Sequence, residues 1–184
     1  MMVRAFRSIL RARLAGLARD ERGTSAVEFA MLLPLMLSLY LGAVEVSQAV
    51  AVDRKVTLSA RSVADLVAQA TSVNTTDLNN ILEAATAVTA PYAAANLKVT
   101  VSQVKIDAEG NAKVDWSVAK NTTARPKDQT VTVPTALKIP NSTLIWGEVH
   151  YTYTPVVGYV LTGTLNLKDQ IYMRPRLSEE VKKT

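Results

Sequence analysis

The most uneven feature of the hydrophobic pattern is an apolar run near the N-terminus. Residues Phe29 to Val44 include no charged side chain, whereas six arginines lie within the first 22 residues. Sixteen helical residues span about 24 Å, but a bilayer core needs about 20 residues. A membrane-spanning helix must therefore begin near Thr24, which places Glu28 inside its start. A carboxylate at the centre of a bilayer costs about 2.5–3.5 kcal/mol, and less near the surface. The position of Glu28 within the start of this helix therefore needs an explanation.

Beyond the run, apolar residues continue at helical spacing. Ala49, Val56, Val63 and Ala70 recur every seven residues, Val52 and Leu66 lie on the adjoining row, and Ser59 interrupts that row. This pattern predicts one amphipathic helix that continues to about residue 70. Pro34 lies within the apolar part and predicts a kink or a loosened turn there. Glu45, just after the run, is interpreted as a carboxylate at the membrane interface.

The remaining chain predicts a second helix and then strands. Thr76 or Asp77 is expected to cap a helix that ends near Thr89, before Pro91. The period then changes to two, and its phase shifts near Gln103, which predicts a bulge. The predicted strands are Leu97–Asp107, Ala112–Val118, Thr130–Val133, Leu144–Thr154 and Asp169–Met173. The first two strands are expected to form a hairpin around a turn at residues 109–111. The tail from Glu179 to Thr184 is expected to fray. The predicted fold is α+β, a long N-terminal helix followed by a second helix and a small antiparallel β-sheet head.

Composition excludes several functions. The net charge is +5, but the residues through Arg22 hold six arginines against Asp20 and Glu21, which leaves the rest near neutral and argues against nucleic acid as a partner. The absence of cysteine excludes a disulfide framework, Cys-ligated zinc and a thiol nucleophile. The single histidine, His150, is interpreted as a structural or surface residue. No phosphate loop, nucleophile elbow or metal-ligand cluster is present in the sequence, so no catalytic residue, cofactor or metal is expected.

The run Arg22-Gly23-Thr-Ser-Ala-Val-Glu28-Phe29, followed by Ala-Met-Leu-Leu-Pro34, resembles the class III prepilin processing site and the N-terminus of TadE-like pseudopilins of tight-adherence (Tad, Flp-type) pili. The resemblance covers about the first 50 residues. More loosely, Trp146–Pro155 and Met173–Pro175 look like the terminal strands of this family.

The resemblance implies that a membrane aspartate protease, the prepilin peptidase, cuts after Gly23. Thr24 would then be the new N-terminus and Glu28 the fifth residue. Glu28 and Phe29 are implied to act in processing or assembly, and Pro34 marks the expected kink. The implied function is that of a minor pilin or pseudopilin, a structural subunit in biogenesis or assembly of a pilus for adherence. The implied partners are the peptidase, other pilins and pseudopilins, the inner-membrane assembly platform and the lipid bilayer.

The expected organisation has three parts: a basic leader at residues 1–23 that is cleaved, a long helix at 24–70 that spans the membrane in its first half, and an α+β head at 71–184. Arginines before the run place the N-terminus in the cytoplasm, so the head is expected in the periplasm or on an extracellular pilus. A secretory signal peptide cut at Ala49-Val-Ala51 is the rival interpretation of the run. A single-pass, membrane-anchored envelope protein with a binding head is the alternative function, and an enzyme with an unrecognised site is a third class.

Overall fold

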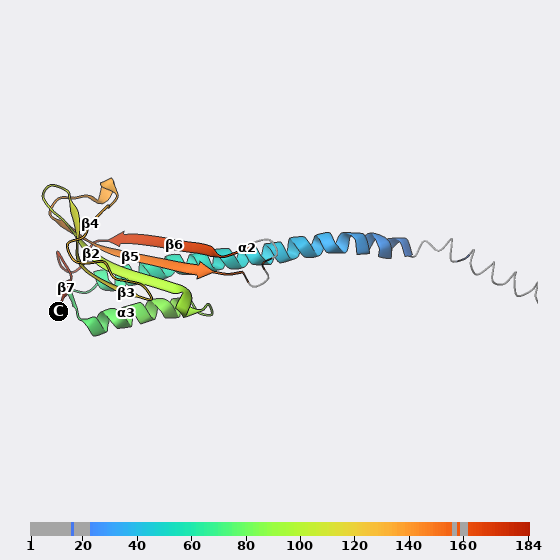
Figure 1. Cartoon of the computed structure of the whole chain (residues 1–184), viewed down its shortest axis with the longest axis horizontal. Coiled ribbons are helices and arrows are strands. Elements are labelled where there is room, and N and C mark those ends of the chain that lie inside the picture. The colour runs from blue at the N-terminus through green and yellow to red at the C-terminus, as the bar shows by residue number, and fades with distance from the viewer. Residues whose placement is uncertain (1–15, 17–22, 156–157, 159–161) are drawn as a thin grey trace, which may run out of the picture. The chain divides into compact units, whose positions relative to one another are not determined.

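In the computed structural model, residues 16, 23–155, 158 and 162–184 are described. The chain forms two compact units, Met1–Val44 and Glu45–Thr184. The elements in chain order are α2 (Thr24–Ala68), β1 (Ser72–Val73), α3 (Thr75–Val88), the 3-10 turn η2 (Ala94–Asn96), β2 (Leu97–Ile106), β3 (Ala112–Lys120), β4 (Thr130–Val131), the 3-10 turn η3 (Thr135–Leu137), β5 (Ser142–Tyr153), β6 (Leu165–Met173) and β7 (Lys182–Lys183). The fold is α+β, as the sequence predicts (Figure 1).

The second unit is built on an antiparallel sheet. Among the described residues, five strands form it in the order β4-β3-β2-β5-β6, and each neighbouring pair is antiparallel. The register between β2 and β3 shifts between Gln103 and Val104, which confirms the predicted bulge. The β2–β3 hairpin around Gly110, where φ is +82°, is also confirmed. β6 begins at Leu165 rather than at Asp169, because pairing with β5 extends it toward the preceding loop.

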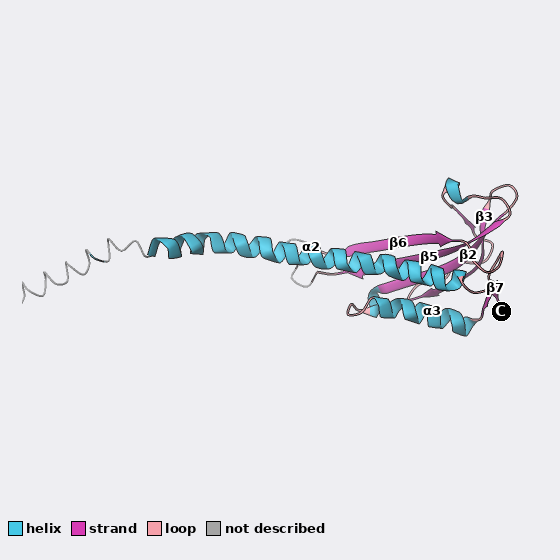
Figure 2. Ribbon diagram, turned by 180° about the vertical axis from the view of Figure 1, so that it is seen from behind, coloured by secondary structure: helices cyan, strands magenta, loops and turns pink. Residues whose placement is uncertain are grey.

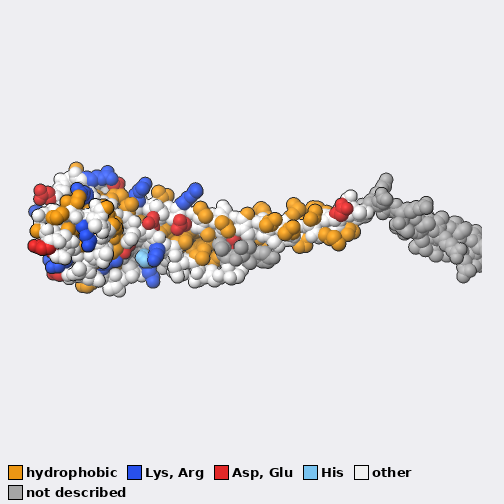
Figure 3. All heavy atoms as spheres, turned by 90° about the horizontal axis from the view of Figure 1, so that it is seen from above, with side chains coloured by type: hydrophobic (Ala, Val, Ile, Leu, Met, Phe, Trp, Pro, Cys, Tyr) orange, Lys and Arg blue, Asp and Glu red, His pale blue; other side chains and the backbone are white. Residues whose placement is uncertain are grey.

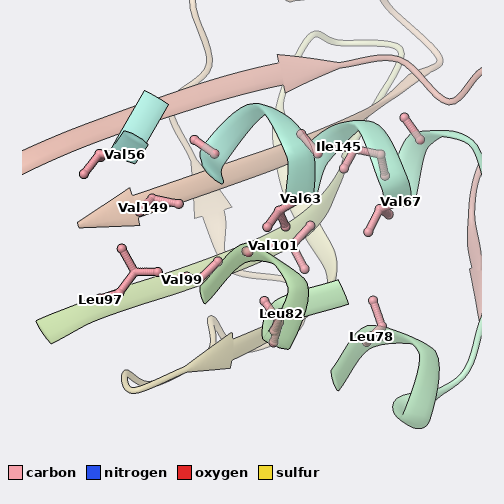
Figure 4. Close-up of a cluster of buried hydrophobic side chains, with 14 of the residues drawn as sticks. Val56, Val63, Val67, Leu78, Leu82, Leu97, Val99, Val101, Ile145 and Val149 are labelled. Carbon is pink, nitrogen blue, oxygen red and sulfur yellow. The ribbon is translucent and has the colours of Figure 1, made fainter. Parts of the chain in front are cut away.

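The main core lies between this sheet and the two helices. The second half of α2 and all of α3 cover the same face of the sheet (Figures 1 and 2), and their apolar side chains meet those of β2 and β5 (Figure 4). The cluster is dominated by valine and leucine and includes Val56, Val63, Val67, Leu78, Leu82, Leu97, Val99, Val101, Ile145 and Val149. A second, smaller cluster lies on the other face of the sheet, where Trp146 stacks on Tyr172 with ring centroids 5.3 Å apart.

The predicted stripe on α2 is correct for Val52, Val56 and Val63 but wrong for Leu66 and Ser59. Leu66 is 43% exposed, whereas Ser59 is fully buried. The Ser59 hydroxyl donates a hydrogen bond of 3.2 Å to the Ala85 carbonyl oxygen of α3. The buried face of α2 therefore contacts both the sheet and α3, and a polar residue can lie in it because a neighbouring helix supplies an acceptor.

Small residues let α2 approach the sheet closely. Gly147 of β5 faces α2, and a Cβ added there would lie 2.8 Å from the Ala60 carbonyl oxygen and 3.1 Å from the Ala64 Cβ. A backbone contact of this kind requires glycine at that strand position.

The start of α3 differs from the prediction by a few residues. Its N-cap is Asn74, and neither Thr76 nor Asp77 takes that role. The Asn74 side chain accepts a hydrogen bond of 2.8 Å from the Asp77 backbone N–H, while the Asp77 carboxylate accepts one of 3.2 Å from the Asn74 N–H. This reciprocal capping box explains why Asp77 belongs to the first turn of the helix.

The C-terminal tail is ordered, so the prediction that it frays was wrong. β7 pairs in parallel with β1, and Val181 is fully buried. The Trp116 indole N–H donates to the Val181 carbonyl oxygen at 2.9 Å, and the Val181 N–H donates to the Gln103 side-chain oxygen at 2.8 Å. Terminal residues fray unless tertiary contacts hold them, and here partners from β2 and β3 do so.

Candidate functional site

The expected cleavage site lies where the long helix begins. Gly23 immediately precedes α2, and Thr24 is its first residue. Gly23 is exposed, and no heavy atom would lie within 4 Å of a Cβ added to it. Most of the expected leader lies outside the described residues. The peptide bond after Gly23 is therefore open to an enzyme, and no described neighbour occupies the space of a side chain.

Glu28 lies one helical turn beyond Thr24. The two residues are four positions apart on α2, so they share a face of the helix. The Glu28 side chain is exposed and makes no hydrogen bond or ion pair with any other described residue. A carboxylate in this position is available to a cation from outside the described part of the chain.

The residues after Glu28 form an uncovered apolar helix. Phe29 is 57% exposed and Met31 is 76% exposed. The other exposed large apolar residues of this stretch are Val27, Leu32, Leu33, Leu35, Met36, Leu37, Leu39 and Tyr40. Figure 3 shows hydrophobic side chains on the surface of this part of α2. Within the described residues, α2 is the one helix long and apolar enough to cross a membrane, which is compatible with a single-pass anchor.

Helix α2 continues through Pro34 without a break. The Ser38 hydroxyl donates a hydrogen bond of 2.7 Å to the Pro34 carbonyl oxygen. Such a bond from Ser to the carbonyl four residues earlier often bends a helix. Ser38 was not singled out from the sequence, although a serine four residues after a proline is a recognisable signal. The kink at Pro34 stays a prediction.

Glu45, interpreted from the sequence as a carboxylate at the membrane interface, lies inside the second unit. It is 2% exposed in the second unit. On the same unit, the Tyr153 hydroxyl donates to the Gln48 side-chain oxygen at 3.4 Å. Burial raises the pKa of Tyr153, and the nearby Tyr92, Glu45 and Tyr151 raise it further. The start of the second unit therefore places polar groups inside it, where the apolar run of the sequence ends.

The head also carries polar clusters. Two contacts, one of 2.8 Å, join the Arg125 guanidinium to the Glu148 carboxylate, and the guanidinium carbon lies 3.9 Å from the Trp146 ring centroid. His150 is exposed on β5, as expected. Among the described residues, no group of three or more His, Asp or Glu side chains is arranged to hold a metal.

Comparison with protein families covers the N-terminal part of the chain. Residues 23–65 match the model of the family described as TadE-like protein. This segment is TadE-like. The match begins at Gly23 and includes Glu28, Phe29 and Pro34. No curated protein and no solved structure matches the chain at a significant level.

The TadE-like segment contains all the residues that the sequence singled out for processing and assembly. The family is associated with the Tad pilus, and its members are structural proteins rather than enzymes. The match ends at Asp65, inside α2, so it does not include the sheet. Inferences about the sheet must therefore come from its own side chains.

Proposed function

We propose that this protein is a minor pilin or pseudopilin that acts in the biogenesis or assembly of a Tad-type pilus for surface adherence. The observation that supports it most directly is the TadE-like segment, which starts at Gly23 and continues over an uncovered apolar helix. A helix of this kind can lie in the bilayer before assembly and can pack against other pilin helices afterwards. The inner-membrane platform and neighbouring pilins are the expected partners.

Processing by a prepilin peptidase after Gly23 belongs to the same proposal. Gly23 is exposed in a 3-10 turn directly before α2, so the enzyme can reach the backbone there at the end of the helix. The arginine-rich leader would remain in the cytoplasm and the head would lie in the periplasm or on the pilus. Cleavage would remove the leader and give Thr24 a free α-amino group.

Glu28 then has a partner of opposite charge. The new amine at Thr24 is largely protonated at neutral pH, and it lies one turn from the Glu28 carboxylate. The two groups can pair within one subunit, or Glu28 can pair with the amine of a neighbouring subunit. A pair of this kind offsets the cost of placing charge in an apolar medium, and breaking a buried pair costs about 3–5 kcal/mol. The pair would determine the axial register of packed helices.

A single-pass envelope protein with a binding head would contain the same apolar helix but would need no cut after Gly23. The mass of the mature protein from its native host distinguishes the two functions. We expect a chain that starts at Thr24, and we expect full-length protein to accumulate in Gly23→Arg. Gly16→Arg is the matched control, because Gly16 is also followed five residues later by a glutamate, Glu21, but an arginine takes the place of Phe29.

The control variant should mature normally. Recovery of intact peptides spanning Arg22 to Ala26 from assembled pili would contradict the proposed cleavage. Equal maturation of the Gly23 and Gly16 variants would also contradict it, because the site would then not depend on Gly23.

A further inference from the structure

Three basic positions form a straight row across the sheet. Lys98 of β2 lies directly opposite His150 of β5, which lies directly opposite Lys168 of β6. Residues in direct antiparallel register point to the same side of a sheet. Their chain neighbours Val99 and Val149 belong to the core under the helices, so the row faces the opposite side. All three side chains are exposed.

The row has no counter-charge of its own. No ion pair joins Lys98, His150 or Lys168 to a described carboxylate. Glu148, on the same face, is held by Arg125. The Asp169 carboxylate accepts a hydrogen bond of 2.8 Å from the Gln170 N–H.

A hollow of about 410 Å³ adjoins the row and is lined by Glu148, His150, Lys168, Asp169 and Gln170. On the other side of the row, Thr152 and Asn166 form a neutral contact of 3.5 Å. The row is therefore a cationic strip beside polar groups, and its two acidic neighbours already accept hydrogen bonds from other groups.

The row lies toward the end of β5 that contacts the first residues of the second unit. Tyr153, three residues after His150 on β5, contacts Gln48, which follows Val44 by four residues. Three strand residues correspond to about 10 Å. The electrostatic screening length at physiological salt is about 8 Å, so the row interacts with a charged surface only when the head lies against that surface.

We propose that the Lys98–His150–Lys168 row binds the phosphate groups of acidic phospholipids and holds the head against the bilayer in which its own helix is anchored. The proposal rests on the membrane anchor and does not require incorporation into a pilus. Acidic headgroups are the occupant that fits, because a tethered head meets the membrane surface at a high effective concentration. Each lysine near an acidic leaflet favours binding by about fivefold.

The test uses the full chain in nanodiscs of phosphatidylcholine alone or mixed with phosphatidylglycerol. Diethyl pyrocarbonate, an uncharged reagent, modifies His150, which is the single histidine of the chain. We expect its modification to be about fivefold slower in the acidic discs. The effect should disappear at high salt, because screening removes the attraction.

Two charge-matched variants isolate the row. In the Lys98→Gln/Lys168→Gln variant, diethyl pyrocarbonate should modify His150 at the same rate in both kinds of disc. Lys127→Gln/Lys138→Gln removes two exposed lysines from the loop between β3 and β5, at the other end of the sheet, and should behave like the unchanged protein. Urea unfolding of both variants verifies that each head is folded.

Several outcomes would overturn the proposal. One is an equal modification rate of His150 in the two kinds of disc. Another is slowing that persists in Lys98→Gln/Lys168→Gln, which would show a general effect of the acidic surface. If inorganic phosphate slowed modification in phosphatidylcholine discs as much as phosphatidylglycerol does, the row would be a site for free anions and the lipid assignment would be wrong. None of these results would affect the cleavage test at Gly23, so the two proposals fail independently.

Discussion

Gly147→Ala tests the closest approach of helix and sheet in the head. The added Cβ would lie 2.8 Å from the Ala60 carbonyl oxygen, 3.1 Å from the Ala64 Cβ and 3.4 Å from the Ala64 nitrogen. Two of these three atoms belong to the backbone of α2, so no side-chain rotation can relieve the contact. The helix must instead move away from β5 by a few tenths of an ångström.

The expected cost follows from the packing around this contact. Val56, Val63 and Val67 on the same helix are fully buried, and close-packed interiors transmit such a displacement to neighbouring contacts. Overpacking a core costs about 1–3 kcal/mol. For a head of this size, we expect the melting temperature to fall by about 3–8 °C.

The assay is urea unfolding of the full chain in detergent, followed by tryptophan fluorescence, because both tryptophans, Trp116 and Trp146, lie in the head. Amide hydrogen exchange in α2 between Val56 and Val67 should become faster as the helix loosens. Gly110→Ala is the control: its φ is +82° and no atom lies within 4 Å of the added Cβ. It should cost about 1 kcal/mol through local strain without changing exchange in α2.

A Gly147→Ala head that unfolds within about 0.5 kcal/mol of the unchanged protein, the usual range for surface substitutions, would refute the reasoning. It would mean that α2 does not approach β5 as closely as the Ala60 contact requires.

Two further predictions concern charge. Glu28→Leu removes the cost of placing a carboxylate in an apolar medium, so membrane insertion and cleavage should persist. Incorporation of the variant into pili should be lost. Variant subunits in purified pili at normal levels would disprove the role of Glu28 in axial register. The Glu180 carboxylate, which accepts a hydrogen bond of 2.6 Å from Lys105, raises the pKa of Lys105 above its ordinary value of 10.5. The interaction that raises the lysine pKa stabilises the fold fully below pH 10.5. This contribution is lost as the pH rises through the pKa of Lys105 in the folded state. The difference in urea midpoint between the unchanged protein and Lys105→Met should therefore be present at pH 8 and shrink above pH 10.5; a difference independent of pH would contradict the pairing.

The elements predicted most accurately were those with strong local patterns. The β2–β3 hairpin, its bulge at Gln103 and the second helix could be predicted because alternation, turn residues and a break at Pro91 are all local signals. The processing residues Gly23, Thr24, Glu28 and Phe29 were also found from a local motif. Their roles in cleavage and assembly stay predictions.

Predictions that depended on distant partners were less accurate. In the sequence, Ser59 interrupts an apolar row, but in the structure the Ala85 carbonyl oxygen of α3 accepts a hydrogen bond from the Ser59 hydroxyl. The tail after Glu179 looked polar and free, but Gln103 and Trp116 bind the backbone of Val181. Nothing within a few residues of Ser59 or Val181 in the chain indicates these partners.

The sequence by itself determined the two helices and the main strands, where the apolar run lies along the chain, and which family its start resembles. These properties depend on side-chain periodicity and short motifs, which the chain carries locally. The tertiary structure alone decided that Gly147 faces the backbone of Ala60, that the C-terminal tail is held, and that Lys98, His150 and Lys168 form one row. Residues 52 and 18 positions apart become neighbours only when strand register brings them together, and register depends on how the whole sheet packs on its helices.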